Sequence, residues 1–285
     1  MEKITENEIE RFAIELLENQ SYTYIYAPSV APDSESPMRT SFEEVILREK
    51  LLSSLISINP MLDYGLIEDA VKQIERIHST ELLTNNESFH KLLTEGVKVE
   101  RTEEGVTRGE IVKLVDFDTV DKNDFIVMNQ FSIIENGRNK RPDLILFVNG
   151  LPLVVLELKN AVDENATVKS AYKQIQTYKE MTPSLFTYNA FCVISDGIEA
   201  KAGTISAGLS RFMAWKSSDG KDEASKLIPQ IETLIEGMLK PETLLDLVRS
   251  FIVFEKDKRE DSKTGITTIE TVKKLAAYHQ YYAVN

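Results

Sequence analysis

Two acidic residues and a lysine stand at the open end of the segment RPDLILFVNGLPLVVLELKNA, which covers residues 141–161. Asp143 precedes the first apolar run, and Glu157 and Lys159 end the second. Two carboxylates in close approach repel unless a cation, a shared proton or a lysine compensates their charge, and oxygen ligands suit Mg²⁺. A metal held there would lower the pKa of a bound water and shield phosphate charge, and Lys159 could orient that water. The residue types therefore indicate metal-assisted hydrolysis of a phosphoester.

The geometry of the turn decides whether the two acids meet. Side chains alternate along a strand, so Glu157 and Lys159 point the same way. A two-residue turn at 149–150 in a regular hairpin would place Asp143 on the opposite face. A three-residue loop, or a bulge near Pro152, would bring Asp143 opposite Glu157, with the Cβ atoms about 5 Å apart. We predict one of these two arrangements.

A less specific interpretation of the same residues is a surface ion pair, because Glu-x-Lys is common on exposed strands. The apolar runs LILFV and LPLVVL, however, predict strands that are buried on both faces. Charges at the end of a buried strand are more often functional than charges on an open face. This flanking pattern favours a functional site.

Composition places limits on the class of protein. The chain has 285 residues, enough for one large domain or two small ones, and its single cysteine, Cys192, lies in an apolar run. No signal peptide or apolar run long enough to span a bilayer is present, so we expect a soluble protein of the cytoplasm with no membrane partner. The net charge of −13 disfavours binding of nucleic acid except through a local basic patch. Candidates for that patch are Arg138, Lys140, Arg141, Lys169, Lys173 and Lys179.

The periodicity of apolar residues predicts helices first, then antiparallel strands, then a helix, a strand and further helices. Thr5 is a plausible N-cap of the first helix, and Ser41 with Glu44 has the spacing of a capping box. The fold class that this order predicts is mixed α/β, with a central mixed sheet flanked by helices. The predicted helices cover residues 5–19, 41–58, 66–78, 86–94, 166–181, 222–238, 240–250 and 266–283. The predicted strands cover residues 97–100, 109–117, 125–134 and 191–196, together with both arms of the hairpin.

With these residues in place, the chain resembles a known nuclease family. Arg-Pro-Asp143 followed by Glu157-Leu-Lys159 resembles the PD-(D/E)-x-K nuclease motif. Gln174 and Tyr178 are similar to the Q-x-x-x-Y motif that follows it in the R (restriction, motor) subunit of type I restriction–modification enzymes. Three longer stretches are similar to the N-terminal region of that subunit in order and spacing: FEEVILREKLLSSLISINP, VNGLPLVVLELKN and SDGIEAKAGTISAGLSRFMAWK.

The resemblance implies a restriction-endonuclease-like core and assigns roles to the motif residues. Asp143 and Glu157 would bind Mg²⁺, for which Mn²⁺ can substitute, and Lys159 would assist the attacking water. Gln174 and Tyr178 would support the site or contact DNA. In the family, an acid on the opening helix can complete the metal site. The best match here is Glu10, with Glu6 one turn earlier as the alternative.

The resemblance also implies a domain organisation and partners. Residues 1–240 would form an endonuclease domain with an N-terminal helical part, and residues 241–285 would form connector helices leading toward a motor domain that the chain lacks. No G-x-x-x-x-G-K-S/T motif is present, so ATP would act only through that motor. The expected partners are double-stranded DNA and the methylation and specificity subunits of the restriction complex.

The function predicted from the sequence is therefore that of a Mg²⁺-dependent DNA endonuclease domain, which hydrolyses phosphodiester bonds within a multisubunit ATP-dependent complex. Two alternatives remain open. One is a catalytically inactive nuclease fold that serves as a docking module and binds no divalent metal. The other is a stand-alone repair or modification-dependent nuclease, which would cut DNA without ATP.

Overall fold

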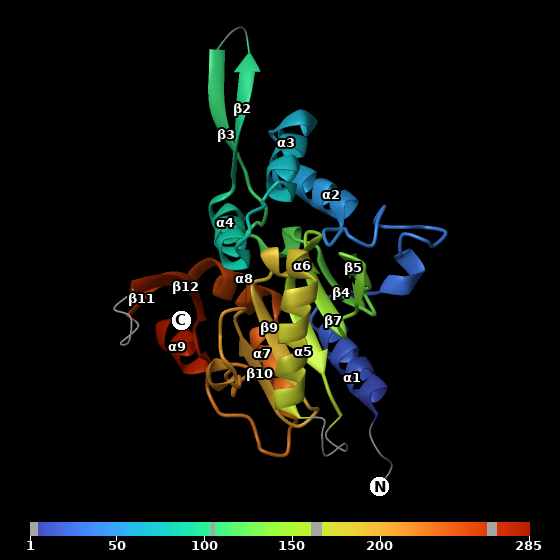
Figure 1. Cartoon of the computed structure of the whole chain (residues 1–285), viewed down its shortest axis with the longest axis vertical. Helices are drawn as coiled ribbons and strands as arrows, with labels where there is room; N and C mark the ends of the chain where they lie inside the picture. Colours follow the sequence, from blue (N-terminus) through green and yellow to red (C-terminus); the bar gives the residue numbers. More distant parts are fainter. Residues whose placement is uncertain (1–4, 104–105, 161–166, 261–266) are drawn as a thin grey trace.

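A six-stranded mixed sheet forms the centre of the chain in the computed structural model, which describes residues 5–103, 106–160, 167–260 and 267–285 (Figure 1). Neighbouring strands are parallel in the pairs β1–β4 and β8–β9 and antiparallel in the pairs β4–β7, β7–β8 and β9–β10. The predicted fold class is confirmed. In sheet order the strands are β1 (Thr23–Tyr26), β4 (Phe125–Asn129), β7 (Leu144–Val148), β8 (Leu151–Leu158), β9 (Phe191–Ser195) and β10 (Ala200–Gly203).

Helices flank this sheet. Helix α5 packs against β8 and β9 and lies in front of the sheet in Figure 1, whereas α7 packs against β10 and lies behind it. Helix α1 packs against both α7 and β8. Within the described ranges, no helix is long and apolar enough to cross a membrane. The helices are α1 (Glu6–Asn19), α2 (Arg48–Ile58), α3 (Tyr64–Glu75), α4 (Leu82–Glu95), α5 (Val168–Met181), α6 (Pro183–Thr187), α7 (Gln230–Met238), α8 (Pro241–Ser250) and α9 (Tyr278–Val284).

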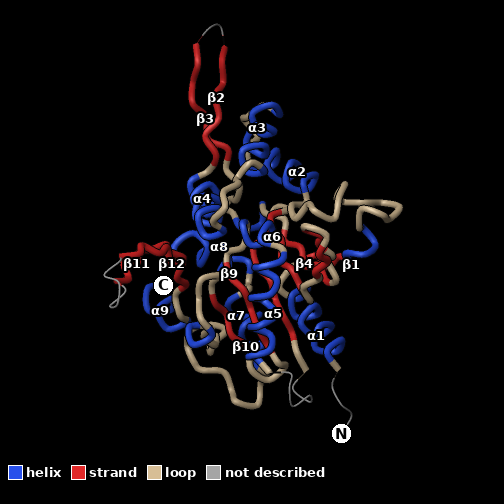
Figure 2. The backbone as a smooth tube through the Cα atoms, viewed as in Figure 1, coloured by secondary structure: helices blue, strands red, loops and turns tan. Residues whose placement is uncertain are grey.

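Three two-stranded ribbons accompany the central sheet. The ribbon of β2 (Val97–Glu103) and β3 (Val106–Val112) projects from the body beside α3 (Figure 2). The ribbon of β5 (Ile133–Glu135) and β6 (Arg138–Lys140) lies near α5. The third ribbon is formed by β11 (Ile252–Glu260) and β12 (Thr267–Leu275).

The third ribbon corrects the prediction of a helix over residues 266–283. Residue 266 lies outside the described residues, and residues 267–275 form β12, which pairs with β11; only α9 is helical in the predicted range. Five of the nine residues of β12 are β-branched, which favours a strand once a partner strand is present. The predicted connector therefore consists of α8, a β-ribbon and α9, and the domain boundary after residue 240 stays a prediction.

Two predicted helix starts are also wrong. Helix α2 begins at Arg48, and the carboxylate of Glu44 accepts from the backbone nitrogen of Thr40 at 2.9 Å instead of closing a box with Ser41. Helix α7 begins at Gln230. The predicted helix over 222–238 would have placed Pro229 in its interior, where proline cannot donate the backbone hydrogen bond that the helix requires. Most of the other predicted elements are present with shifted ends, and Thr5 caps α1 as predicted.

The predicted strand over 125–134 is interrupted. It ends as β4 at Asn129, and Gln130 adopts a left-handed conformation with φ of 57°. The chain then resumes as β5. This break turns the side chains of Asn129 and Gln130 toward α1, where both contact Glu10.

The β7–β8 hairpin combines a two-residue turn with a bulge. Asn149 and Gly150 form the turn with φ of 53° and 82°, which excludes the three-residue loop. The register then shifts near Pro152, because Phe147 pairs with Pro152 whereas Leu146 pairs with Val154. The predicted bulge is confirmed. Leu144 consequently pairs with Leu156, and the residues just outside this pair, Asp143 and Glu157, are brought together.

The strands around this hairpin are buried along their whole length, as the apolar runs predicted. Every residue of β7, β8 and β9 is buried, including Glu157. Cys192 is buried in β9 without a disulfide partner. The site residues are therefore fixed to the most enclosed part of the sheet.

Asn149→Ala is expected to lower the free energy of unfolding by about 3 kcal/mol, because the change removes three hydrogen bonds made by a fully buried side chain. The Asn149 side chain accepts from the nitrogen of Asp124 at 2.8 Å and donates to Leu114 O and Asn123 Oδ1, both at 2.9 Å. Urea denaturation measures the change. Asn136→Ala is the matched control, since Asn136 has a similar φ of 52° but is exposed. Equal losses in the two variants would assign the effect to backbone conformation alone.

Candidate functional site

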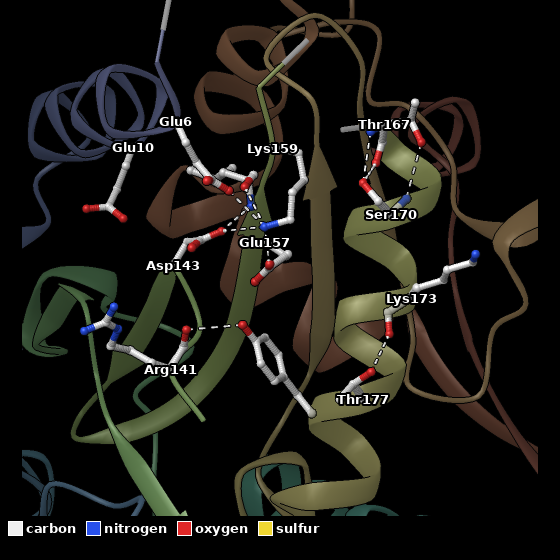
Figure 3. Close-up of polar contacts among 12 residues, drawn as sticks. Glu6, Glu10, Arg141, Asp143, Glu157, Lys159, Thr167, Ser170, Lys173 and Thr177 are labelled. Atoms are coloured by element: carbon white, nitrogen blue, oxygen red, sulfur yellow. Dashed lines mark hydrogen bonds and ion pairs between the residues drawn. The ribbon is translucent and has the colours of Figure 1, made fainter. Parts of the chain in front are cut away.

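The structure brings Asp143, Glu157 and Lys159 together at the end of the central hairpin (Figure 3). Lys159 Nζ lies 2.6 Å from Glu157 Oε1 and 4.0 Å from Asp143 Oδ2. Asp143 directly precedes β7, Glu157 is the penultimate residue of β8, and Lys159 directly follows β8. The hairpin register thus assembles the three residues that the sequence singled out.

The two carboxylates differ in how they are held. Asp143 Oδ2 accepts a hydrogen bond of 2.6 Å from the backbone nitrogen of Leu158, which fixes its carboxylate against the partner strand. Glu157 is 1% exposed, and its Oε2 has no hydrogen-bond donor among the described residues. A buried carboxylate oxygen without a donor is costly unless a cation or a ligand satisfies it. Such an oxygen indicates a cation-binding position.

Burial governs the electrostatics of the pair. It raises the pKa of Asp143 above its usual value, although the Leu158 amide and the Lys159 ammonium act in the opposite direction. Burial, followed by the charge of Asp143, likewise raises the pKa of Glu157. For Lys159, burial alone would lower the pKa, but the neighbouring carboxylates of Glu157 and Glu6 outweigh it and raise the pKa. One ammonium therefore compensates the paired acids only in part.

The donor set fits a hard divalent cation that keeps water or phosphate ligands. Among the described residues, no group of three His, Cys, Asp or Glu side chains is placed to hold a metal ion. Mg²⁺ needs only one or two protein carboxylates, because it retains several waters and takes phosphate oxygens as ligands. Asp143 and the unpartnered Oε2 of Glu157 meet that requirement.

Glu10, the predicted third acid, lies on α1 near this pair but has other partners. Its two carboxylate oxygens accept from Asn129 Nδ2 at 2.7 Å and from Gln130 Nε2 at 3.1 Å. Its charge contributes to raising the pKa of Asp143. The role of Glu10 as a metal ligand stays a prediction.

The sequence did not predict these two amide partners of Glu10, nor the contact that Glu6 makes. Glu6 Oε1 lies 2.9 Å from Lys159 Nζ. The available signal was the spacing of Glu6 and Glu10, which places both on the face of α1 that meets the sheet.

Gln174 and Tyr178 lie on α5, one turn apart. The Tyr178 hydroxyl donates to the carbonyl oxygen of Arg141 at 3.2 Å, which ties the helix to the segment that enters β7 (Figure 3). Burial and the nearby charge of Glu157 raise the pKa of Tyr178. The Tyr178 contact places α5 beside the site, whereas the roles of Gln174 and Tyr178 in supporting the site or contacting DNA stay predictions.

Two of the predicted basic residues can be placed relative to the acidic pair. Arg141 and Lys173 occupy opposite sides of it in Figure 3, and both are exposed. Lys179 differs, because it is half-buried and its Nζ donates to Gln176 Oε1 at 2.7 Å. Of the six predicted cations, those that are exposed are Arg138, Arg141, Lys169 and Lys173, whereas Lys140 is half-buried like Lys179.

Comparison with known families gives a match over most of the chain. The family model described as "Type I restriction enzyme R protein N terminus" matches residues 3–211. The chain belongs to this family. The resemblance seen in the motif residues is thereby confirmed over most of the chain.

Individual relatives of this type I restriction enzyme family match nearly the whole chain. The type I restriction enzyme HindI endonuclease subunit of Haemophilus influenzae is 38% identical over 99% of the chain and 26% of its own length. The putative type I restriction enzyme MjaIXP endonuclease subunit of Methanocaldococcus jannaschii is 29% identical over 97% of the chain and 27% of its own length. The chain thus spans about a quarter of the length of these relatives.

Proposed function

We propose that the chain is the nuclease module of a type I restriction endonuclease subunit and hydrolyses DNA phosphodiester bonds with Mg²⁺. The observation that carries this proposal is the meeting of Asp143 and Glu157 beside Lys159, with one buried carboxylate oxygen unpartnered. The names of the relatives, which are endonuclease subunits, support the same reaction.

The residues divide the chemistry between them. Asp143 and Glu157 would hold Mg²⁺, which supplies Lewis acidity and a bound water of lowered pKa. The Leu158 amide keeps the Asp143 carboxylate in place. The Lys159 ammonium, with its raised pKa, stays protonated at neutral pH and stabilises negative charge on the phosphate. Tyr178 holds α5 against the segment before β7. Gln174 and Glu10 complete the polar surroundings.

The wider setting of the proposal is the one that the resemblance to type I restriction enzymes implies. The substrate is double-stranded DNA in the cytoplasm, delivered by an assembly with methylation and specificity subunits. ATP acts through motor domains that lie outside this chain. A net charge of −13 gives the chain a low intrinsic affinity for DNA. The exposed basic side chains contact DNA phosphates locally. Cutting therefore depends on delivery by the complex.

Calorimetric titration with Mn²⁺, as a substitute for Mg²⁺, tests the proposal. The parent chain should bind the ion, and both Asp143→Ala and Glu157→Ala should abolish binding while circular dichroism shows an intact fold. Asp69→Ala, which removes an exposed acid on α3, is the control and should bind as the parent does. If the parent binds no Mn²⁺ even with a short DNA duplex to supply phosphate ligands, the docking-module interpretation replaces the nuclease.

A further inference from the structure

The ammonium of Lys159 is shared between two carboxylates of very different character. It lies 2.6 Å from an oxygen of Glu157 in the sheet and 2.9 Å from an oxygen of Glu6 in the first turn of α1. The Glu157 side chain is 1% exposed, whereas that of Glu6 is 49% exposed. Glu6 and Lys159, which are 153 positions apart, therefore meet at the border between the buried site and solvent (Figure 3).

A metal bound under the proposed function would lie close to this ammonium. Oε1 of Glu157 faces Lys159, and the unpartnered Oε2 of the same carboxylate would hold Mg²⁺. Two cations on one buried carboxylate repel each other. Metal binding should therefore weaken the contact between the ammonium and Oε1.

We propose that Glu6 is a positioning residue, which keeps the Lys159 ammonium beside the site when Glu157 binds the metal. This inference rests on the proposed function of the site. The second anion is already in contact, so the exchange breaks one ion pair while Glu6 Oε1 and the carbonyl oxygen of Leu158, at 2.9 and 3.2 Å, keep the nitrogen near the site. Lys159 thus remains beside the reacting phosphate and does not compete for the carboxylate.

Glu6 is suited to this role and Glu10 is not. Both oxygens of Glu10 accept from the amides of Asn129 and Gln130, which hold that carboxylate away from Lys159. Glu6 follows the N-cap Thr5, whose capping box with Glu8 fixes the start of α1. The position of Glu6 is therefore set by the local structure of the helix, and its carboxylate already contacts the Lys159 ammonium.

A double-mutant cycle on Mn²⁺ affinity tests the exchange. With Lys159 present, Glu6→Gln should weaken Mn²⁺ binding about tenfold, because the ammonium then stays on Glu157. In a Lys159→Met background, Glu6→Gln should change the affinity by no more than about twofold, the effect of a distant charge alone. Equal weakening in both backgrounds would overturn the proposal, since Glu6 would then act as a ligand or as a simple charge. Glu15→Gln, an exposed acid on the same helix, is the charge control.

Reductive methylation of lysines, followed by mass spectrometry, gives a second measurement that needs no metal. Loss of Glu6 should raise the modification rate of Lys159 about threefold or more, while exposed Lys173 stays unchanged. An unchanged rate at Lys159 would overturn the positioning role even if Mn²⁺ binds. Absence of Mn²⁺ binding in the parent, with the rate increase present, would reject the metal-dependent exchange and the proposed function while leaving the Glu6 contact established.

Discussion

Glu157→Gln is expected to raise the free energy of unfolding at alkaline pH while removing the binding of Mn²⁺. Burial and the charge of Asp143 raise the pKa of this carboxyl above its usual value of 4.5. The folded chain therefore holds a proton that the unfolded chain releases, and ionisation of Glu157 opposes folding. Glutamine has the same shape but never ionises, so it avoids this cost.

The sign of the pH dependence follows from the raised pKa of Glu157. Because the folded pKa is raised, the stability contributed by the protonated carboxyl is present at low pH and lost as the pH rises through the folded pKa. A difference of one between the folded and unfolded pKa values corresponds to about 1.4 kcal/mol of stability. We therefore expect a gain of about 2 kcal/mol or more for Glu157→Gln at pH 8.5 and little difference near pH 5.

Urea denaturation of the parent and Glu157→Gln at the two pH values measures this effect. Asp143→Asn is a useful comparison. The Leu158 amide and Lys159 partly offset the effect of burial on the pKa of Asp143, so the charge of this carboxylate costs less. We expect a smaller gain there. A less stable Glu157→Gln variant at pH 8.5 would mean that the ion pair with Lys159 contributes more than burial removes.

Lys273→Met is expected to flatten the pH dependence of stability between pH 7 and pH 10. Lys273 lies on β12 and is 1% exposed, and its Nζ donates to Asn86 Oδ1 and Asn189 O at 2.8 Å each. The ring of Phe254 lies 5.3 Å away. No carboxylate pairs with this ammonium among the described residues, and burial lowers its pKa to about 7.

For this lysine the folded pKa lies below the unfolded value of 10.5, so the unfolded chain binds the proton more tightly. Stability contributed by the neutral amine is therefore lost as the pH falls toward 7 and increases above it, by about 1.4 kcal/mol per pH unit up to the unfolded pKa. Urea denaturation at pH 7, 8 and 9 should show this slope in the parent and not in Lys273→Met.

The adjacent Lys274 provides the matched control for this measurement. Lys274 is exposed on the same strand and pairs with Glu255, so Lys274→Met should leave the slope unchanged. Identical slopes in the parent and both variants would show that Lys273 stays charged in the folded chain. That result would make the hydrogen bonds to Asn86 and Asn189 a stable site for a buried ammonium.

Local sequence signals determined the framework that carries the site. Alternation and apolar runs predicted the strands β7, β8 and β9. Asn149, Gly150 and Pro152 predicted either a three-residue loop or a bulge, and the structure shows the bulge. The predicted meeting of Asp143 and Glu157 followed, because strand register relates residues only 14 positions apart in the chain. Thr5 likewise marked the start of α1, since a capping box is complete within one helical turn.

Local signals gave wrong predictions where a different partner competed for the same residues. Ser41 and Glu44 have capping-box spacing, but Thr40 engages Glu44 and α2 begins later, at Arg48. Residues 267–275 have helical spacing of apolar side chains, but β11 supplies a strand to pair with, and the β-branched residues favour that pairing.

Only the tertiary structure decided which distant groups share the buried charges. Glu6 reaches Lys159 across 153 positions, and Lys273 reaches Asn86 across 187. Such contacts depend on how helices and ribbons pack against the sheet, and periodicity along the chain carries no information about that packing. The sequence by itself therefore determined the acids and the strand ends that hold them. Packing decided which side chains compensate the charge of those acids. It also decided that Lys273 is buried without a carboxylate partner among the described residues.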